Sequence, residues 1–178
     1  MKSKRLYLSR NSQTLAKNIV LIDGFSGSGK TLVAPAISHL KYSEQWLLNE
    51  VYDNISILNY FGDISKKSAN TLLNVESDKN IYNLMIGRNV NFRCADISSP
   101  QHNNLYQKYY SRTKKIAGDM VSDEIDKINP ILPLHVHYIF GYTDLLLKCF
   151  EDKLKLYIVV LRNPFFLIKT WIEGNWVN

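Results

Sequence analysis

Residues 18–31 read NIVLIDGFSGSGKT, and this stretch decides the fold. Its first six residues form an apolar run typical of a buried strand, and its last eight match G-x-x-x-x-G-K-[ST] ahead of a helical stretch at 31–40. Glycines let the backbone approach phosphate oxygens closely, while inward N–H groups and the positive end of the next helix attract an anion. The candidate phosphate ligands are Gly24, Ser26, Gly27, Ser28, Gly29, Lys30 and Thr31. The stretch therefore predicts a phosphate-binding loop between a strand and a helix, with a plain Gly/Ser-rich turn as the alternative.

Strands and helices are expected to alternate along the rest of the chain. Further strands are predicted at 45–48, 131–140 and 154–161, and helices at 50–61, 114–128 and 141–150, with one or two more across 68–84. Residues 86–106 are polar and contain Pro100, which indicates a long irregular loop. Pro133 favours a place at the sheet edge or early in its strand, and Thr143 is expected to cap the following helix. The pattern predicts an α/β fold of three layers, α/β/α, with a central parallel sheet, in a single domain spanning residues 1–178.

Composition limits the classes of function. The 178 residues carry a net charge of +6 and contain no apolar run near the roughly 20 residues that cross a bilayer. The basic residues are scattered, and include Lys2, Lys4, Arg5, Arg10, Lys66, Lys67, Arg112, Lys114 and Lys115. A modest positive field favours anionic ligands, but no basic stripe with a stacking platform indicates nucleic acid. Cys94 and Cys149 lack metal-ligand or redox spacing, so no metal site is expected, and residues 1–18 lack a secretory signal, which predicts a cytoplasmic protein.

A second motif lies near the end of the chain. The strand expected at 154–161 runs into Arg162, Asn163 and Pro164, and Thr170 follows eight residues after the arginine. Ligands of open α/β sheets bind at the carboxyl ends of strands, although a structural ion pair and a helix-surface hydroxyl are the simpler interpretation. With the glycine-rich loop, this motif resembles the sulfotransferases that use 3′-phosphoadenosine 5′-phosphosulfate, a family of the P-loop superfamily. The resemblance implies that Arg162 and Thr170 hold the 3′-phosphate of that cofactor, because a guanidinium fork and a hydroxyl suit a phosphate monoester.

The resemblance covers two motifs, and the chain departs from the family in two respects. The loop is a full Walker-type sequence, which leaves a small-molecule or nucleotide kinase using Mg-ATP as the alternative. Lys30 would then hold the β and γ phosphates, Thr31 would ligate magnesium, and Asp23 would activate the acceptor. Neither late strand ends in a second carboxylate that would place the metal, which favours sulfuryl transfer. The family also continues beyond the helix after Pro164, so the sequence is expected to be either a fragment that lacks the C-terminal part of the domain or a minimal domain.

Sulfuryl transfer needs a cation for the leaving phosphate and a base for the acceptor. Lys30 is the candidate cation. The family places a catalytic histidine after the strand that precedes the R-N-P strand, and His137 occupies that position, with His135 on the same strand face. Two strand histidines without a catalytic role are the alternative. A branch of the family that acts on sugars uses a glutamate downstream of the loop, for which Glu50 or Asp53 is the candidate, although carboxylates at a helix start are often dipole partners.

The acceptor stays open at this level. Arg88, Asn89, Asn91 and Arg93 could border its pocket and would then bind an anionic or sugar-like group, whereas a solvated loop is the simpler interpretation. A small-molecule or carbohydrate acceptor is the expected partner, with lipid and protein tyrosine also compatible. A nucleotide-binding switch without catalysis is a third interpretation, and the oligomeric state is undetermined.

Overall fold

The computed structural model of the chain describes residues 14–174, except for the side chains of Asn103 and Asp119. The basic residues Lys2, Lys4, Arg5 and Arg10, and most of the segment that was tested for a secretory signal, lie outside this range. The elements follow in the order β1 (Asn18–Asp23), α1 (Lys30–Ser38), β2 (Leu47–Leu48), α2 (Val51–Tyr60), α3 (Lys66–Met85), η1 (Pro100–Asn103), α4 (Tyr106–Arg112), α5 (Asp119–Ile128), β3 (Ile131–His135), α6 (Asp144–Cys149), β4 (Leu154–Val159) and α7 (Pro164–Glu173).

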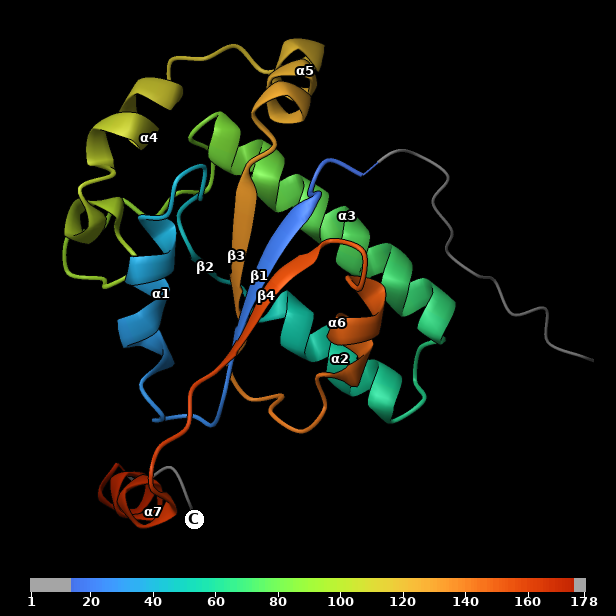
Figure 1. The fold of residues 1–178 in the computed structure, drawn as a ribbon, viewed down its shortest axis with the longest axis vertical. Helices are drawn as coiled ribbons and strands as arrows, with labels where there is room; N and C mark the ends of the chain where they lie inside the picture. Colours follow the sequence, from blue (N-terminus) through green and yellow to red (C-terminus); the bar gives the residue numbers. More distant parts are fainter. Residues whose placement is uncertain (1–13, 175–178) are drawn as a thin grey trace, which may run out of the picture.

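The strands form one sheet at the centre of the molecule (Figure 1). The order is β2-β3-β1-β4, and every pair is parallel. Val20 lies opposite Pro133 on one side and Leu156 on the other. The predicted α/β class with a central parallel sheet flanked by helices is therefore confirmed.

Alternate residues of β1 enter two different cores. Ile19 and Leu21 belong to a large core formed with α2, α3, α5 and α6, whereas Val20 and Ile22 pack with Ala34 of α1 and with Trp46 in a much smaller one. Figure 1 shows α1 on one side of the sheet, where α4 also lies, and α2, α3 and α6 on the other. The period-2 alternation of a strand thus divides the apolar residues of β1 unequally between the two faces.

The third strand differs from its prediction. It ends at His135 and lies between β2 and β1, so the expected edge position of Pro133 is wrong. The N–H of Ile131 donates to Tyr42 O, in the segment before β2. Backbone N–H groups two residues apart in a strand point to the same side, so the nitrogen of Pro133 also faces that segment. Only an isolated bridge, Ser43 to Ile131, precedes the short β2 ladder there. A proline fits this interior strand because its missing donor lies at a gap in the ladder.

Helix positions were predicted more closely than strand lengths. α2 and α6 lie within the predicted segments, and α3 is one continuous helix. The irregular loop predicted at 86–106 is irregular only in part, because η1 occupies Pro100–Asn103 and α4 begins at Tyr106. The helix predicted from residue 114 begins only at Asp119, after Gly118. Thr143 is the residue before α6, but its hydroxyl donates to Asp23 Oδ2 at 2.9 Å instead of capping the helix.

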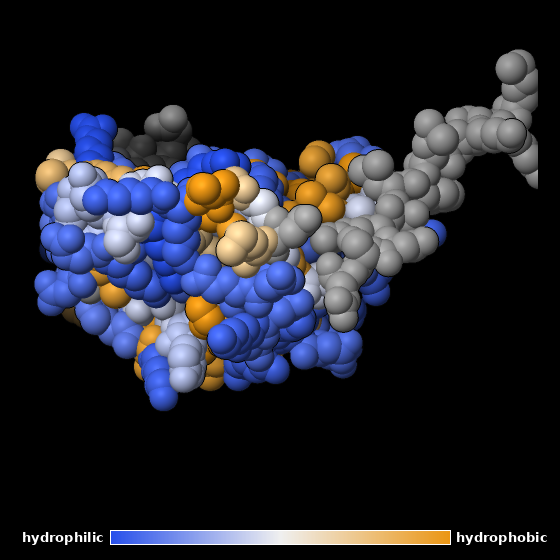
Figure 2. Space-filling model, turned by 90° about the horizontal axis from the view of Figure 1, so that it is seen from above, coloured by the Kyte–Doolittle hydropathy of each residue, from blue (hydrophilic) through white to orange (hydrophobic). Residues whose placement is uncertain are grey.

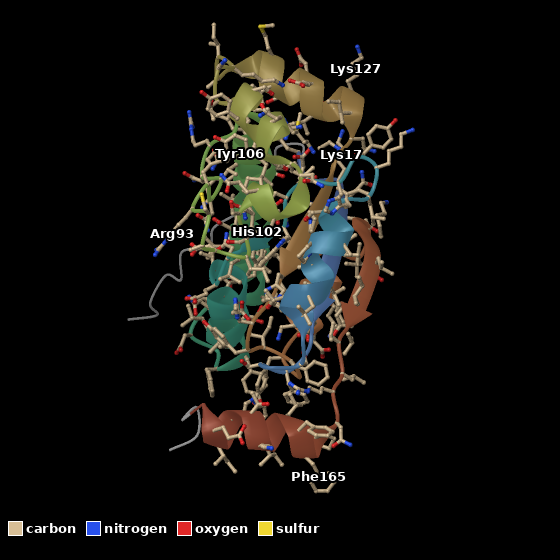
Figure 3. All side chains as sticks on the ribbon, turned by 90° about the vertical axis from the view of Figure 1, so that its left-hand side faces the viewer. Lys17, Arg93, His102, Tyr106, Lys127 and Phe165 are labelled. Carbon is tan, nitrogen blue, oxygen red and sulfur yellow. The ribbon has the colours of Figure 1, made fainter. Side chains whose placement is uncertain are left out.

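The last helix, α7, lies at the carboxyl end of the sheet, apart from the other helices (Figure 1). Its exposed residues include Phe165, which is 81% exposed and points away from the body of the molecule in Figure 3. At the opposite end, Figure 2 shows a mostly hydrophilic surface with separate hydrophobic patches. Within residues 14–174, no helix combines the length and apolar character needed to cross a membrane.

Candidate functional site

The glycine-rich loop joins the carboxyl end of β1 to the first residue of α1, as the sequence predicts. Gly24 has φ 141°, and a Cβ at this position would lie 2.3 Å from Val160 O. Only glycine fits there, because the backbone after β4 passes directly over the turn. Gly29, with φ 104°, is the residue before α1 and turns the chain into the helix. The loop is therefore held between two strand ends, with the N-terminus of α1 behind it.

Lys30 lies across this loop and is almost fully buried. Its Nζ donates to Gly24 O, to Phe25 O at 3.1 Å and to His137 O at 3.0 Å. Burial lowers the pKa of Lys30, and the negative charges of Asp23 and Asp53 oppose that shift. The ammonium thus links the loop to the chain after β3, and its flexible four-carbon stem allows it to turn toward an anion bound at the loop.

Two buried carboxylates flank the lysine and differ in how they are bonded. Both oxygens of Asp23 have hydrogen-bond partners: Oδ1 accepts from Gly24 N at 2.6 Å, and Oδ2 accepts from the hydroxyls of Thr143 at 2.9 Å and Tyr157 at 2.8 Å. Asp53 Oδ1 accepts the backbone N–H groups of the two residues after Val136, at 2.9 and 3.1 Å. Asp53 Oδ2 is buried and has no hydrogen-bond partner among the described residues.

Opposing influences act on the pKa of Asp53. Burial raises its pKa, while the backbone N–H groups of Tyr138 and His137 and the charge of His137 partly oppose the shift. The sequence named Asp53 only as an alternative to Glu50. The fold brings Asp53 to the end of β3 because α2 runs beneath that end, with Asp53 in its first turn. Glu50, in contrast, is the exposed residue before α2 and lines neither cavity described below.

Both histidines predicted on this strand lie beside the loop, although β3 ends at His135 and His137 follows it. His135 is 2% exposed, contacts the Trp46 ring at a centroid distance of 5.3 Å and the His137 ring at 5.0 Å, and neither of its nitrogens has a partner among the described residues. Burial, with smaller contributions from His137 and Lys30, lowers the pKa of His135 to about 4, so the ring is neutral near pH 7. His137 Nε2 is also buried and has no hydrogen-bond partner within residues 14–174.

Two cavities meet at this place. The smaller, of about 310 Å³, lies under the loop and is lined by Phe25, Ser26, Gly27, Gly29, Lys30, Thr31, His135 and His137. The larger, of about 520 Å³, is lined by Thr31, Gln45, Trp46, Leu47, Leu48, Asn89, Asn91, Asp96, Ile97, Ser98 and His137. Thr31 and His137 line both, so they stand between a glycine-rich, cationic cavity and a polar neighbouring one.

The second sequence motif reaches the loop through Arg162, whereas Thr170 bonds within its own helix, and their shared role at a 3′-phosphate stays a prediction. Arg162 Nη1 donates to Gly27 O at 3.2 Å, whereas the Thr170 hydroxyl donates to Phe166 O at 2.8 Å within its own helix. No hydrogen bond joins Arg162 to Thr170 among the described residues. Of the predicted phosphate ligands, Gly24, Ser28, Arg162 and Thr170 line neither cavity, although the buried Ser28 Oγ has no partner among the described residues.

Several contributors were missed from the sequence. Trp171 Nε1 donates to Ser26 O at 2.9 Å and its ring lies 6.3 Å from that of Phe25, so α7 supports the loop directly. Trp46 forms part of both the small core and the larger cavity. In the sequence Trp46 and Trp171 are only apolar members of their segments, and their position at the site follows from tertiary packing that no local pattern encodes.

A buried ion pair supports the far side of the larger cavity. Glu44, 2% exposed, accepts from Arg112 Nη1 at 2.5 Å and Nη2 at 3.1 Å, and from the Tyr109 hydroxyl at 2.5 Å. The Tyr109 hydroxyl in turn accepts from Gln45 N at 2.5 Å. This network joins α4 to the segment that carries Gln45 and Trp46, and nothing in the sequence pattern singled out Glu44 or Arg112 as partners.

The described residues contain no group of three or more His, Cys, Asp or Glu side chains that could hold a metal ion. Comparison of the chain with protein-family models, with curated proteins and with solved structures finds no match. The function of the site must therefore be argued from its own chemistry.

Proposed function

We propose that this chain binds an adenosine phosphosulfate at the residue 24–31 loop and transfers its sulfuryl group to an acceptor in the neighbouring cavity. The observation that carries the proposal is the pair of adjoining cavities with Thr31 and His137 in both walls. A donor held by Lys30 and the loop N–H groups would place its transferable group at this boundary. The donor that the two sequence motifs favour is 3′-phosphoadenosine 5′-phosphosulfate.

Each side chain has a defined task in this reaction. The acceptor oxygen attacks sulfur, the bond from sulfur to the bridging phosphate oxygen breaks, and adenosine 3′,5′-bisphosphate leaves. His137 Nε2 takes the acceptor proton, a role that suits an imidazole near neutral pH. Lys30, released from the loop carbonyls, would balance the charge that develops on the leaving phosphate. Arg162, already bonded to the loop at Gly27 O, would meet the 3′-phosphate after a side-chain rotation.

A kinase that uses Mg-ATP is the second candidate, and Asp53 is the observation that favours it. The sequence supplied no second carboxylate at a strand end, but the fold places Asp53 close enough to Lys30 to oppose the lowering of the lysine pKa, and close enough to Asp23 for the charge of Asp23 to raise the pKa of Asp53. Its free Oδ2 could accept a proton from an acceptor hydroxyl or bind a magnesium-bound water. Thr31 would then ligate the metal.

Calorimetric titration separates these candidates. The full chain is titrated with adenosine 3′,5′-bisphosphate and with ATP, each with and without magnesium, and the series is repeated on Arg162→Ala. Bisphosphate binding that needs no metal and weakens at least about tenfold in Arg162→Ala, as expected for loss of a charge-assisted phosphate contact, supports sulfuryl transfer. Preference for Mg-ATP with no effect of Arg162→Ala would overturn it in favour of the kinase.

A second pair of variants tests the base. His137→Gln should leave bisphosphate affinity near that of the parent and reduce turnover by about 10² to 10⁴, the range typical of a lost general base. His39→Gln, at an exposed position beyond α1, is the matched control and should keep full turnover. If His137→Gln retains turnover while Asp53→Asn loses it, the base is Asp53.

A further inference from the structure

The larger cavity has a lining that restricts what it can bind. Of its lining residues, all within the described part of the chain, Asp96 is the only one with a carboxylate and none is Lys or Arg. The charge of Asp96 is itself paired with Arg93, whose Nε lies 3.6 Å from Asp96 Oδ1. Arg93 points outward from its loop in Figure 3, and neither it nor the exposed Arg88 lines the cavity. An anionic acceptor would therefore meet no cationic side chain here.

The polar groups of the cavity are held in place before anything binds. Asn91 Nδ2 donates to Asp96 Oδ2 at 3.0 Å and to Ser98 Oγ at 2.9 Å. Gln45 Nε2 donates to Ser98 O at 3.0 Å, and this bond joins the irregular segment 86–99 to the segment before β2. A pre-organised set of amides and hydroxyls binds hydroxyl groups with little loss of side-chain entropy.

Apolar surface lies beside these polar groups. Leu48 and Ile97, about half exposed at 51% and 47%, and the buried Trp46 share the wall with the amides. Trp46 Nε1 is a buried donor without a partner among the described residues. A lining that offers apolar faces, amides and an indole donor matches a ring with C–H faces and hydroxyl edges. The volume of about 520 Å³ falls in the range of small-molecule sites, roughly 300–1,000 Å³.

We propose that the acceptor bound in this cavity is a neutral sugar, and that one of its hydroxyl groups receives the transferred group. This inference rests on the proposed function and adds the acceptor class. The sugar oxygen attacks sulfur, its proton passes to His137 Nε2, and the bond from sulfur to the phosphate oxygen breaks. The products are a sugar sulfate ester and adenosine 3′,5′-bisphosphate.

Binding is tested without the donor, so that the result does not depend on which group is transferred. Saturation-transfer NMR on the full chain uses methyl glucoside, methyl N-acetylglucosaminide, glucuronate and 4-nitrophenol as probes. We expect the two neutral glycosides to bind and glucuronate to bind at least about tenfold more weakly. Asp96→Asn should reduce this difference in affinity between the neutral glycosides and glucuronate, because it removes the only carboxylate among the lining residues.

Two arginine substitutions provide a matched pair. Ile97→Arg places a long charged side chain in the cavity wall and should abolish glycoside binding. Leu58→Arg, at a position 42% exposed on α2 and outside the lining, changes an aliphatic residue in the same way and should leave binding intact. Because both positions are half exposed, neither variant is expected to unfold the chain.

The outcomes separate the two proposals. Preferential binding of glucuronate or 4-nitrophenol, absence of glycoside binding, or glycoside binding that survives Ile97→Arg would overturn the sugar acceptor. Glycoside binding that behaves as expected, in a chain that fails to bind adenosine bisphosphate, would leave the sugar site standing and overturn the sulfotransferase.

Discussion

The two faces of the sheet are covered by different amounts of apolar structure. The face that carries Leu21 closes a large core with α2, α3, α5 and α6, whereas the face that carries Ile22 has a small buried set with Ala34 and Trp46. Stabilisation by apolar burial scales with the area removed from water. Most of the stability must therefore come from the first face, and the second is available for polar groups.

Among the described residues, most of the buried polar atoms without a protein partner gather around the residue 24–31 loop, at the carboxyl end of the sheet. Of those in the described residues, Ser28 Oγ, Trp46 Nε1, Asp53 Oδ2, both nitrogens of His135 and His137 Nε2 belong to the candidate site. Such groups cost about 1–3 kcal/mol each when nothing binds them. Their concentration around one loop is typical of a site that is kept for binding at the expense of stability.

The largest expected effect concerns the buried polar network of Glu44, which joins the segment before β2 to α4 and, through Arg112, to Leu84 O of α3. Arg112→Met should lower the free energy of unfolding by about 3–5 kcal/mol, because the buried Glu44 loses both guanidinium contacts and keeps only Lys108 Nζ, at 3.2 Å, as a cationic partner among the described residues. Lys115→Met breaks the more exposed pair with Glu124, whose side chains are 35% and 36% exposed, and should cost less than about 1 kcal/mol. Urea unfolding measures the loss of stability in both variants. Equal losses would show that the buried Glu44 network stabilises the fold no more than an exposed ion pair does.

The second test compares the two cores within one strand. Leu21 and Ile22 are both fully buried and adjacent in β1, but they face opposite sides. Truncation of such residues to alanine costs about 2–5 kcal/mol, with the higher values where the surroundings cannot relax. We expect Leu21→Ala near the upper end and Ile22→Ala near the lower end, because a single helix covers Ile22. A larger loss for Ile22→Ala in urea unfolding would contradict the comparison.

The third test uses the histidine buried on the second face. The pKa of His135 falls from 6.5 to about 4 on folding, so the unfolded chain binds its proton more tightly than the native chain does. Stability is therefore lost as the pH falls from about 6.5 toward 4, by up to about 3 kcal/mol at pH 4. His135→Gln should remove this part of the acid destabilisation.

The measurement is urea unfolding of parent and His135→Gln at several pH values. Above about pH 7 the difference between the two should be constant, which provides an internal control for the packing change that the substitution causes. Below about pH 6.5 the parent should lose stability faster than His135→Gln as the pH falls. Parallel pH profiles across the whole range would show that His135 accepts its proton in the native chain, and that its surroundings are wetter than the structure implies.

The comparison also explains what could be predicted from the sequence. The glycine-rich loop between β1 and α1, and the parallel sheet, follow from local patterns of apolar residues and glycines. The interior place of Pro133 could not be predicted, because it depends on a gap in the neighbouring ladder. Asp53 was no stronger a candidate than Glu50, since only the packing of α2 under β3 buries one and exposes the other. The Glu44–Arg112 pair joins residues 68 apart in the sequence, which no local pattern records.

The smallest expected effect concerns α7, which contacts the loop but adds little to either core. Phe165 is 81% exposed, whereas Leu167 in the same helix is 4% exposed. Phe165→Ser should change the free energy of unfolding by no more than about 0.5 kcal/mol, as is usual for exposed positions. Leu167→Ser should cost more, because it places a hydroxyl at a buried apolar position.

Calorimetric titration of Phe165→Ser and Leu167→Ser with adenosine 3′,5′-bisphosphate shows whether α7 supports binding or stability. The indole of Trp171 holds α7 to the loop at Ser26 O, so displacement of the helix should weaken bisphosphate binding more than it weakens the fold. We expect Leu167→Ser to lose affinity and Phe165→Ser to keep it. If Leu167→Ser unfolds the chain as readily as Leu21→Ala does, α7 belongs to the stabilising structure after all. The division between a face that provides stability and a side that provides the site would then no longer hold at the carboxyl end of the sheet.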